Sequence, residues 1–275
     1  MIFCKELNKS FPDKKTMFKE LRKNAPEIIK VKKASFKNSE PVSYTVKAKT
    51  ATKEDVAISE IALGDYIYPI INTTNWLDSH GDVHLDNLWD VSLKDQRGRL
   101  YYIINHQLEI GKVIAYPDDM EAFVKTFNWS DLGQPYPGTT QALVFKVLLT
   151  DAAESTALAA IKSRKPLQNS VRMQYVSMSL CINDSDPEFK QEYANFYKYL
   201  AVIANKEDAM EKGYFWAILE AKVCQEGSAV LFGSNSVTPI LSESEFNYDP
   251  ADASQKEYID PADASQEKKF KYYDY

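Results

Sequence analysis

Short apolar runs recur through the middle of the chain, and most of them have the length of β-strands. β-Branched and aromatic residues dominate these runs, as is typical of buried or half-buried strands. The predicted strands are residues 66–71, 100–104, 142–149, 171–182, 214–223 and 228–232. Two helices are expected between the later strands. Asp151 and Glu154 form a capping signal for the first, and Asp186 with Pro187 opens the second.

These elements show no regular strand–helix alternation, which disfavours a doubly wound fold. We therefore expect an α+β protein that is β-rich with helices inserted, in which the short strands form a curved sheet or a small barrel-like core. The 275 residues suffice for a large core. Three parts are expected: a basic N-terminal arm with a short helix at 1–55, the β-rich domain at 56–242 and a flexible tail at 243–275.

The first 50 residues differ in charge from the rest. They contain thirteen Lys and Arg against five acidic residues, whereas the whole chain has a net charge of −6. Asp13 is expected to cap a helix with Met17, Phe18 and Leu21 on one side, and Pro26 to interrupt it. The arm has no aromatic residues interleaved with Arg for base stacking, so we expect weak docking on the domain rather than nucleic-acid binding.

The C-terminal segment contains a tandem repeat. The sequence DPADASQ occurs at 249–255 and again at 260–266. Its small and polar residues bury too little apolar surface to offset the entropy of ordering, which predicts a flexible tail.

Several classes of protein are excluded by what the sequence lacks. It has no glycine-rich phosphate-binding motif, no apolar run of membrane-spanning length and no secretory signal. The three cysteines, Cys4, Cys181 and Cys224, form no CxxC pair. We therefore expect a cytoplasmic protein with reduced thiols, no cofactor, no structural metal and no membrane association.

Only three histidines are available as a catalytic base. Two lie in the run DSHGDVH, where an extended chain would project four potential metal ligands to one side: Asp78, His80, Asp82 and His84. Gly81 favours a turn that would break this alternation, so a polar loop is preferred to a metal site. His106 differs, because it directly follows the predicted strand at 100–104.

Two further residues have suitable positions for catalysis. Ser170 lies where a strand begins, so its hydroxyl could be held rigidly beside a groove. Glu226 lies between two apolar runs and needs a partner if it is buried. Glu220 offers the same chemistry earlier in the strand, and the sequence does not decide between the two. The oxyanion donor stays open, with Arg172 as one candidate.

Together these positions resemble one family, the prohead (capsid maturation) serine proteases of tailed phages. The resemblance covers about residues 60 to 240. It rests on four motifs in the family's order: Asp78-x-x-Gly81-Asp82-Val83; Asn105-His106 followed by Ile110-Gly111; Asn169-Ser170; and Glu226-Gly227-Ser228-Ala229-Val230 ending in Gly233-Ser234-Asn235.

The resemblance implies a Ser-His-Glu triad. The histidine of the family's NH motif falls on His106, the serine of its SxGF strand on Ser170 and the glutamate of its EVSLV strand on Glu226. This chain departs from the family where Val-Arg-Met follows Ser170 and where Gly-Ser-Asn replaces Pro-Ala-Asn at 233–235. The long interval between Ser170 and Glu226 is interpreted as a helical insertion between strands.

The resemblance also implies the fold of the herpesvirus assemblins, a β-barrel surrounded by helices. The expected function is cleavage of scaffold and capsid proteins, and of the enzyme itself, inside the assembling prohead in the host cytoplasm. A homodimer is suggested by the resemblance alone. Two other hypotheses stay open: a non-catalytic capsid-assembly module on the same fold, and a metal-dependent hydrolase centred on the DSHGDVH run.

Overall fold

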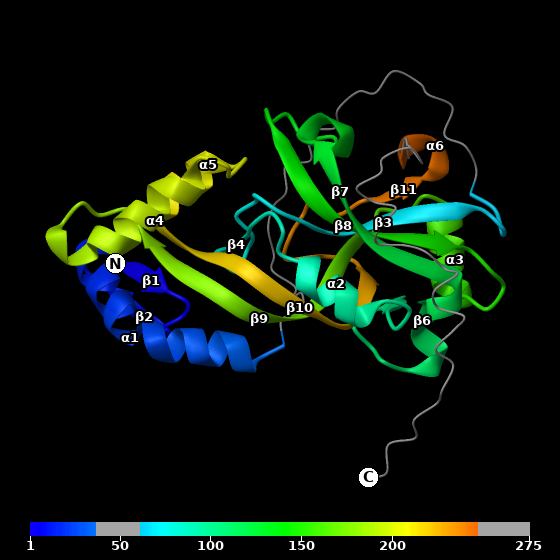
Figure 1. The fold of residues 1–275 in the computed structure, drawn as a ribbon, viewed down its shortest axis with the longest axis horizontal. Coiled ribbons are helices and arrows are strands. Elements are labelled where there is room, and N and C mark those ends of the chain that lie inside the picture. The colour runs from blue at the N-terminus through cyan, green and yellow to red at the C-terminus, as the bar shows by residue number, and fades with distance from the viewer. Residues whose placement is uncertain (37–60, 247–275) are drawn as a thin grey trace, which may run out of the picture.

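The computed structural model describes residues 1–36 and 61–246. They form a mixed α/β structure with three sheets (Figure 1). The first is the hairpin of β1 (Ile2–Cys4) and β2 (Lys9–Phe11). The second contains β4 (Asp82–His84), β5 (Tyr101–Ile104), β6 (Val113–Ala115), β9 (Gln168–Ile182) and β10 (Tyr214–Val230). The third contains β3 (Tyr66–Thr73), β7 (Met120–Asn128), β8 (Thr139–Leu148) and β11 (Ile240–Ser242).

None of these sheets closes into a barrel within the described ranges. The strand orders are β4-β10-β5-β6, with β9 also paired to β10, and β11-β3-β8-β7. The structure confirms the expected mixture of helices and strands. It does not confirm the barrel-like core. In the second sheet, the short strands β4, β5 and β6 pair with their neighbours over only a few residues each.

The antiparallel pair β9–β10 connects the two ends of the molecule (Figure 1). The two strands predicted at 214–223 and 228–232 are one strand, β10, which ends at Val230. An irregularity in its pairing with β9 lies between Val223 and Gly227. Between β9 and β10 the chain forms the predicted helical insertion: η4 (Pro187–Phe189), α4 (Lys190–Leu200) and α5 (Lys206–Lys212).

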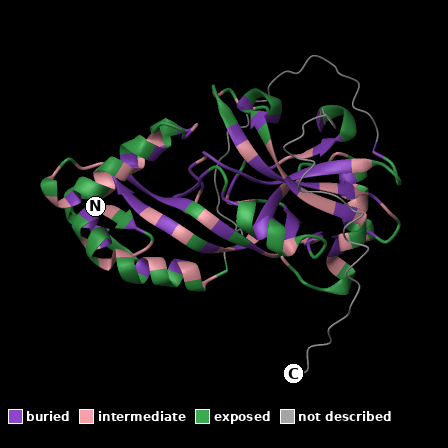
Figure 2. Cartoon of the chain, viewed as in Figure 1, coloured by how far each residue is buried: buried purple, intermediate pink, exposed green. Residues whose placement is uncertain are grey.

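The main core lies where the second and third sheets meet. Buried side chains of both sheets join one cluster, including Ile71 and Phe145 from the third sheet and Val223 and Ala229 from the second. Figure 2 shows that buried residues follow the strands, whereas the outer faces of the helices are exposed. The remaining elements lie around the sheets: α2 (Asp90–Gln96), α3 (Ser155–Lys162), η1 (Ile110–Lys112), η2 (Pro117–Asp119) and η3 (Trp129–Leu132).

Three predicted capping signals occur in the structure, and Asp186 supplies one of them by accepting from Glu188 N at the start of η4. The Asp13 side chain accepts a hydrogen bond from Thr16 N at the start of α1 (Lys14–Ala34). Glu154 caps α3 by accepting from Ala157 N, although the expected box with Asp151 does not form.

The N-terminal helix is longer than the sequence predicted. It runs for 21 residues through Pro26, which was expected to end it. Met17, Phe18, Leu21 and Ile28 are buried along its length, so packing on both sides of the proline offsets the lost backbone hydrogen bond. The helix packs against β9, so the described part of the N-terminal arm, residues 1–36, is joined to the core.

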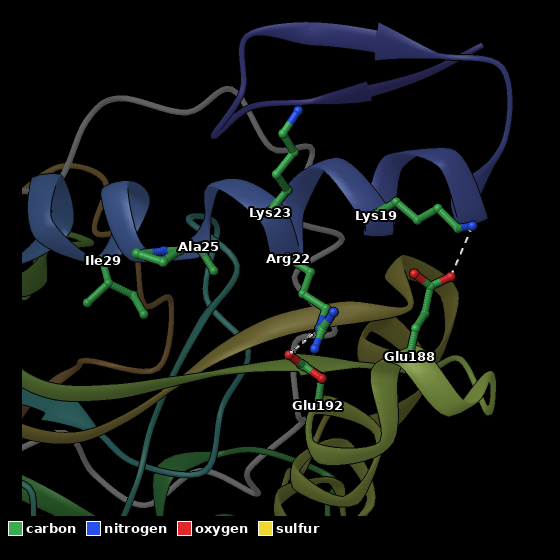
Figure 3. Close-up of a pocket in the computed structure, with 8 residues that line it drawn as sticks. Lys19, Arg22, Lys23, Ala25, Ile29, Glu188 and Glu192 are labelled. Atoms are coloured by element: carbon green, nitrogen blue, oxygen red, sulfur yellow. Dashed lines mark hydrogen bonds and ion pairs between the residues drawn. The ribbon is translucent and has the colours of Figure 1, made fainter.

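Three ion pairs also fix α1 to the insertion. Lys15, Lys19 and Arg22 contact Asp186, Glu188 and Glu192 respectively. Figure 3 shows the last two pairs across an open groove between α1 and the start of α4. All three pairs are partly exposed, so their contribution to stability is small.

The predicted tail begins too early. Residues Glu243–Phe246 form the short helix α6, and Phe246 is buried because its ring stacks on Tyr68 with centroids 3.9 Å apart. Both DPADASQ repeats lie outside the described residues. Within the described part of the chain, no helix has the length and hydrophobicity required to cross a membrane.

Candidate active site

His106 lies in the tight turn that follows β5. Asn105 N donates to Ala229 O, which ties the turn to the neighbouring strand β10. Asn105 and His106 have φ angles of 51° and 58°, in the left-handed region that non-glycine residues rarely adopt. Such conformations persist where the surroundings fix them, and they cluster at functional sites. The His106 side chain is only 7% exposed.

Glu226 lies on β10, inside the segment between Val223 and Gly227 where the pairing with β9 is irregular. The preceding residue, Gln225, also has a left-handed backbone, with φ of 69°. The Glu226 side chain is fully buried, and its Oε1 atom lies 2.6 Å from His106 Nδ1. A buried carboxylate is stable only when its oxygens have partners. In a catalytic triad the imidazole contacts the acid through Nδ1, as His106 does here, and exchanges protons through Nε2.

Ser228 completes the surroundings of this pair. Its hydroxyl donates to Glu226 Oε2 at 2.6 Å and accepts from His106 N at 3.0 Å. Ser228 is fully buried. The motif Glu226-Gly227-Ser228 is visible in the sequence, but sequence reasoning gave Ser228 no role. The spacing of two along a strand, which puts both side chains on one face, was the available signal.

Ser170 is the residue of β9 directly opposite Ser228. Directly paired residues have Cβ atoms about 5 Å apart and project to the same face of the sheet. The Ser170 side chain therefore lies on the face that carries the Ser228 hydroxyl. Ser170 is 7% exposed, whereas Ser228 is fully buried.

The strand around Ser170 is firmly held. Asn169 Nδ2 donates to Thr238 O at 2.9 Å, and Tyr102 OH donates to Asn169 Oδ1 at 2.6 Å. Burial also raises the pKa of Tyr102 well above its ordinary value, so this phenol stays a donor. These contacts fix the backbone that carries Ser170 against β5 and the segment before β11.

The structure thus brings the three predicted residues to one end of the β9–β10 pair. It also distinguishes the two glutamates. Glu226 contacts His106, whereas Glu220 lies earlier on β10, opposite Ser177 of β9. Arg172, the candidate oxyanion donor, has its guanidinium 4.4 Å from the centre of the Phe36 ring.

Exposed apolar side chains lie near this end of the sheet. Because β5 and β10 are parallel neighbours, the residues that follow each strand leave the sheet at the same edge. Leu108 and Ile110 follow β5 and are 48% and 88% exposed, and Leu231 and Phe232 follow β10 and are 65% and 61% exposed. An apolar surface therefore borders the His106 turn.

The run DSHGDVH forms a separate buried network. Asp82 Oδ1 lies 2.5 Å from Lys32 Nζ, and Tyr175 OH donates to Asp82 Oδ2 at 2.8 Å. His84 lies between Asn72 and Tyr175, at 2.9 and 3.4 Å. Protein partners thus surround Asp82 and His84, two of the four proposed ligands. Within the described residues, no group of three or more His, Cys, Asp or Glu side chains could hold a metal ion.

This network has strongly shifted pKa values. Burial lowers the pKa of His84 to about 4 and, together with the nearby Asp82 charge, raises the pKa of Asp78 to about 7. Burial alone would raise the pKa of Asp82, but the Lys32 ammonium and the Tyr175 hydroxyl hold it below its ordinary value.

Comparison with known proteins gives no match: no family model, curated protein or solved structure resembles the chain significantly.

Proposed function

We propose that the protein is a serine endopeptidase in which Ser170, His106 and Glu226 form the catalytic triad. The observation that carries this proposal is the contact of 2.6 Å between His106 Nδ1 and buried Glu226, with Ser170 opposite Ser228 on the adjacent strand. Acid, imidazole and hydroxyl in this order are the parts of a serine hydrolase site.

The chemistry follows from these positions. Ser170 Oγ attacks the scissile carbonyl carbon while His106 Nε2 takes its proton, which gives a tetrahedral intermediate. When the C–N bond breaks, His106 returns the proton to the leaving amine. Water then hydrolyses the acyl-enzyme by the same route. Glu226 holds the ring with Nδ1 protonated and stabilises the imidazolium, without itself becoming protonated.

The proposed substrates are the scaffold and capsid proteins of a tailed phage, and the enzyme itself. This part rests on the order of the four motifs that resemble the prohead proteases. The same resemblance is the basis for proposing an assemblin-like core, a homodimer, and action inside the assembling prohead in the host cytoplasm. The exposed apolar residues beside the His106 turn are suited to contact an extended polypeptide.

Covalent labelling tests the proposed chemistry independently of the substrate. A fluorophosphonate should form an Oγ–P bond with Ser170 and release fluoride, and peptide mapping should find the adduct there. Ser170→Ala should not be labelled, and His106→Gln should be labelled much more slowly. Equal labelling of wild type and Ser170→Ala would contradict the assignment.

A further inference from the structure

We propose that Ser228 is a positioning residue of the active site, which fixes the Glu226 carboxylate and the His106 backbone relative to each other. Its catalytic consequence rests on the proposed function. The structural part of the claim concerns only the hydrogen bonds among His106, Glu226 and Ser228, so it can be tested without protease activity.

The Ser228 side chain bonds to both other groups. Its hydroxyl proton is directed to Glu226 Oε2, while its oxygen receives the His106 backbone N–H. The two bonds use the hydroxyl as donor and as acceptor at once, so each restricts the direction of the other.

The position of Ser228 is itself fixed by the sheet. It pairs with Ser170 on β9 and with Ile103 on β5, so a strand borders it on each side. A hydroxyl held between two strands is a rigid reference point for the loop that carries His106. This matters because the His106 backbone has a left-handed conformation that needs support.

Loss of the hydroxyl would affect both neighbours. Glu226 Oε2 would lose a charge-assisted hydrogen bond in a site that excludes water, and the His106 N–H would lose its acceptor. The carboxylate could then turn away from the direction that aligns it with His106 Nδ1. Ser228 is not the nucleophile in this arrangement, because it is fully buried and its proton is directed to Glu226.

Ser92 provides a matched control. It is also a buried serine, and its hydroxyl accepts a backbone N–H of the same strand, from Val223 at 2.8 Å. Ser92→Ala therefore removes an acceptor for β10 without touching Glu226. Each alanine variant leaves a buried backbone N–H without its acceptor, so both should unfold at a lower urea concentration than wild type, and Ser228→Ala more so because it also removes the bond to Glu226.

The test combines kinetics with NMR of the histidine side chains. The chain has three histidines, and His106→Gln assigns the signals of His106. In a Ser170→Ala background, which prevents self-cleavage, the His106 Nδ1–H proton should resonate far downfield because its hydrogen bond to Glu226 is short. Ser228→Ala should shift this resonance upfield or broaden it beyond detection, and Ser92→Ala should leave it unchanged.

With the nucleophile present, Ser228→Ala should lower kcat by about tenfold to a hundredfold, the loss expected for one hydrogen bond to a charged group. KM should stay within about twofold. Ser228→Cys replaces the alanine variant if that variant fails to fold. It roughly keeps the side-chain volume but offers only a weak hydrogen-bond donor, so it should also lower kcat.

The outcomes separate the two proposals. An unchanged resonance and unchanged kcat in Ser228→Ala, or an equal effect of Ser92→Ala, would overturn the role of Ser228. A resonance that depends on Ser228 in a protein without proteolytic activity would support the positioning role and reject the proposed function.

Discussion

His106 Nδ1 lies 2.6 Å from Glu226 Oε1, although 120 positions separate the two residues in the chain. The sheet produces this contact, because β5 and β10 run parallel and side by side, with Ile104 opposite Ala229. The turn after β5 then brings the His106 side chain back to Glu226, which lies three residues before Ala229 on β10. A contact of this kind cannot be read from local sequence, but its consequences can be tested one residue at a time.

The two glutamates of β10 should differ sharply in their effect on catalysis. Glu226→Gln removes the negative charge beside His106 and disturbs its tautomer, so kcat should fall by about 10³- to 10⁴-fold. Glu220→Gln is the matched control and should stay close to wild type. Kinetic assays of both variants check this, and equal losses would contradict the assignment of Glu226.

Gly227 should be required for packing beneath the site. A Cβ atom at this position would lie 2.7 Å from Phe145 Cε2 and 3.0 Å from two atoms of Ile71. Gly227→Ala should therefore destabilise the protein by about 1–3 kcal/mol through overpacking. Gly111→Ala is the control, because a Cβ atom added at Gly111 would enter open space. Urea unfolding should show a large loss for Gly227→Ala only, and equal effects would show that the strand can shift.

The sequence predicted local features more reliably than their arrangement. Strands β3, β5, β8, β9 and β10 follow from runs of β-branched and aromatic residues, and the Asp13 cap follows from residue type and spacing. The nine-residue strand β7 and the short strands β1, β2, β4, β6 and β11 were not predicted. The helix through Pro26 was not predicted, because its stability comes from burial against the core rather than from local propensity. The barrel-like core is not confirmed, for a related reason: runs of strands predict a β-rich core, but closure depends on pairings between distant segments.

The same distinction holds for the candidate site. His106, Ser170 and Glu226 were found by their motifs, and the structure places them at one end of β9–β10. Ser228 was missed because a buried serine in a strand has no distinctive local signal. The network around Asp82 was missed because Lys32 and Tyr175 come from segments far away in the chain.

The buried ion pair between Lys32 and Asp82 should be important for stability. Among the described residues, Lys32→Met leaves the buried Asp82 carboxylate with Tyr175 as its one side-chain donor, at a cost of about 3–5 kcal/mol. Adding Asp82→Asn should recover part of this loss, because no unpaired charge remains. Lys19→Met removes a partly exposed ion pair and should cost less than about 1 kcal/mol. Chemical unfolding of the three variants tests this, and a small effect of Lys32→Met would contradict the burial of the pair.

His84 should make stability depend on pH. Its pKa in the folded protein is about 4 against an ordinary value of 6.5, so the unfolded chain binds more protons between these values. The contribution of His84 to stability should therefore fall as the pH decreases through this range, by up to about 3 kcal/mol. Asp78 acts in the opposite sense, because its raised pKa of about 7 favours the folded state at lower pH.

The variant His84→Gln isolates the first contribution, since Asp78 is present in both chains. Urea unfolding at pH 7 and at pH 4, which span most of the interval between the two pKa values of His84, should show that the stability of wild type relative to His84→Gln falls with decreasing pH. Parallel curves would mean that His84 is not held neutral in the folded state.

The central claim, that Ser170 is the nucleophile of an endopeptidase, is tested most directly by the intact mass of the purified chain over time. Self-cleavage should shorten wild type from 31.3 kDa while Ser170→Ala stays whole under the same conditions. Ser228→Ala should be cleaved, but more slowly. If wild type and Ser170→Ala both keep their full mass with scaffold and capsid proteins supplied, and those proteins also stay intact, the protease account is wrong. The alternative of a non-catalytic assembly module would then take its place.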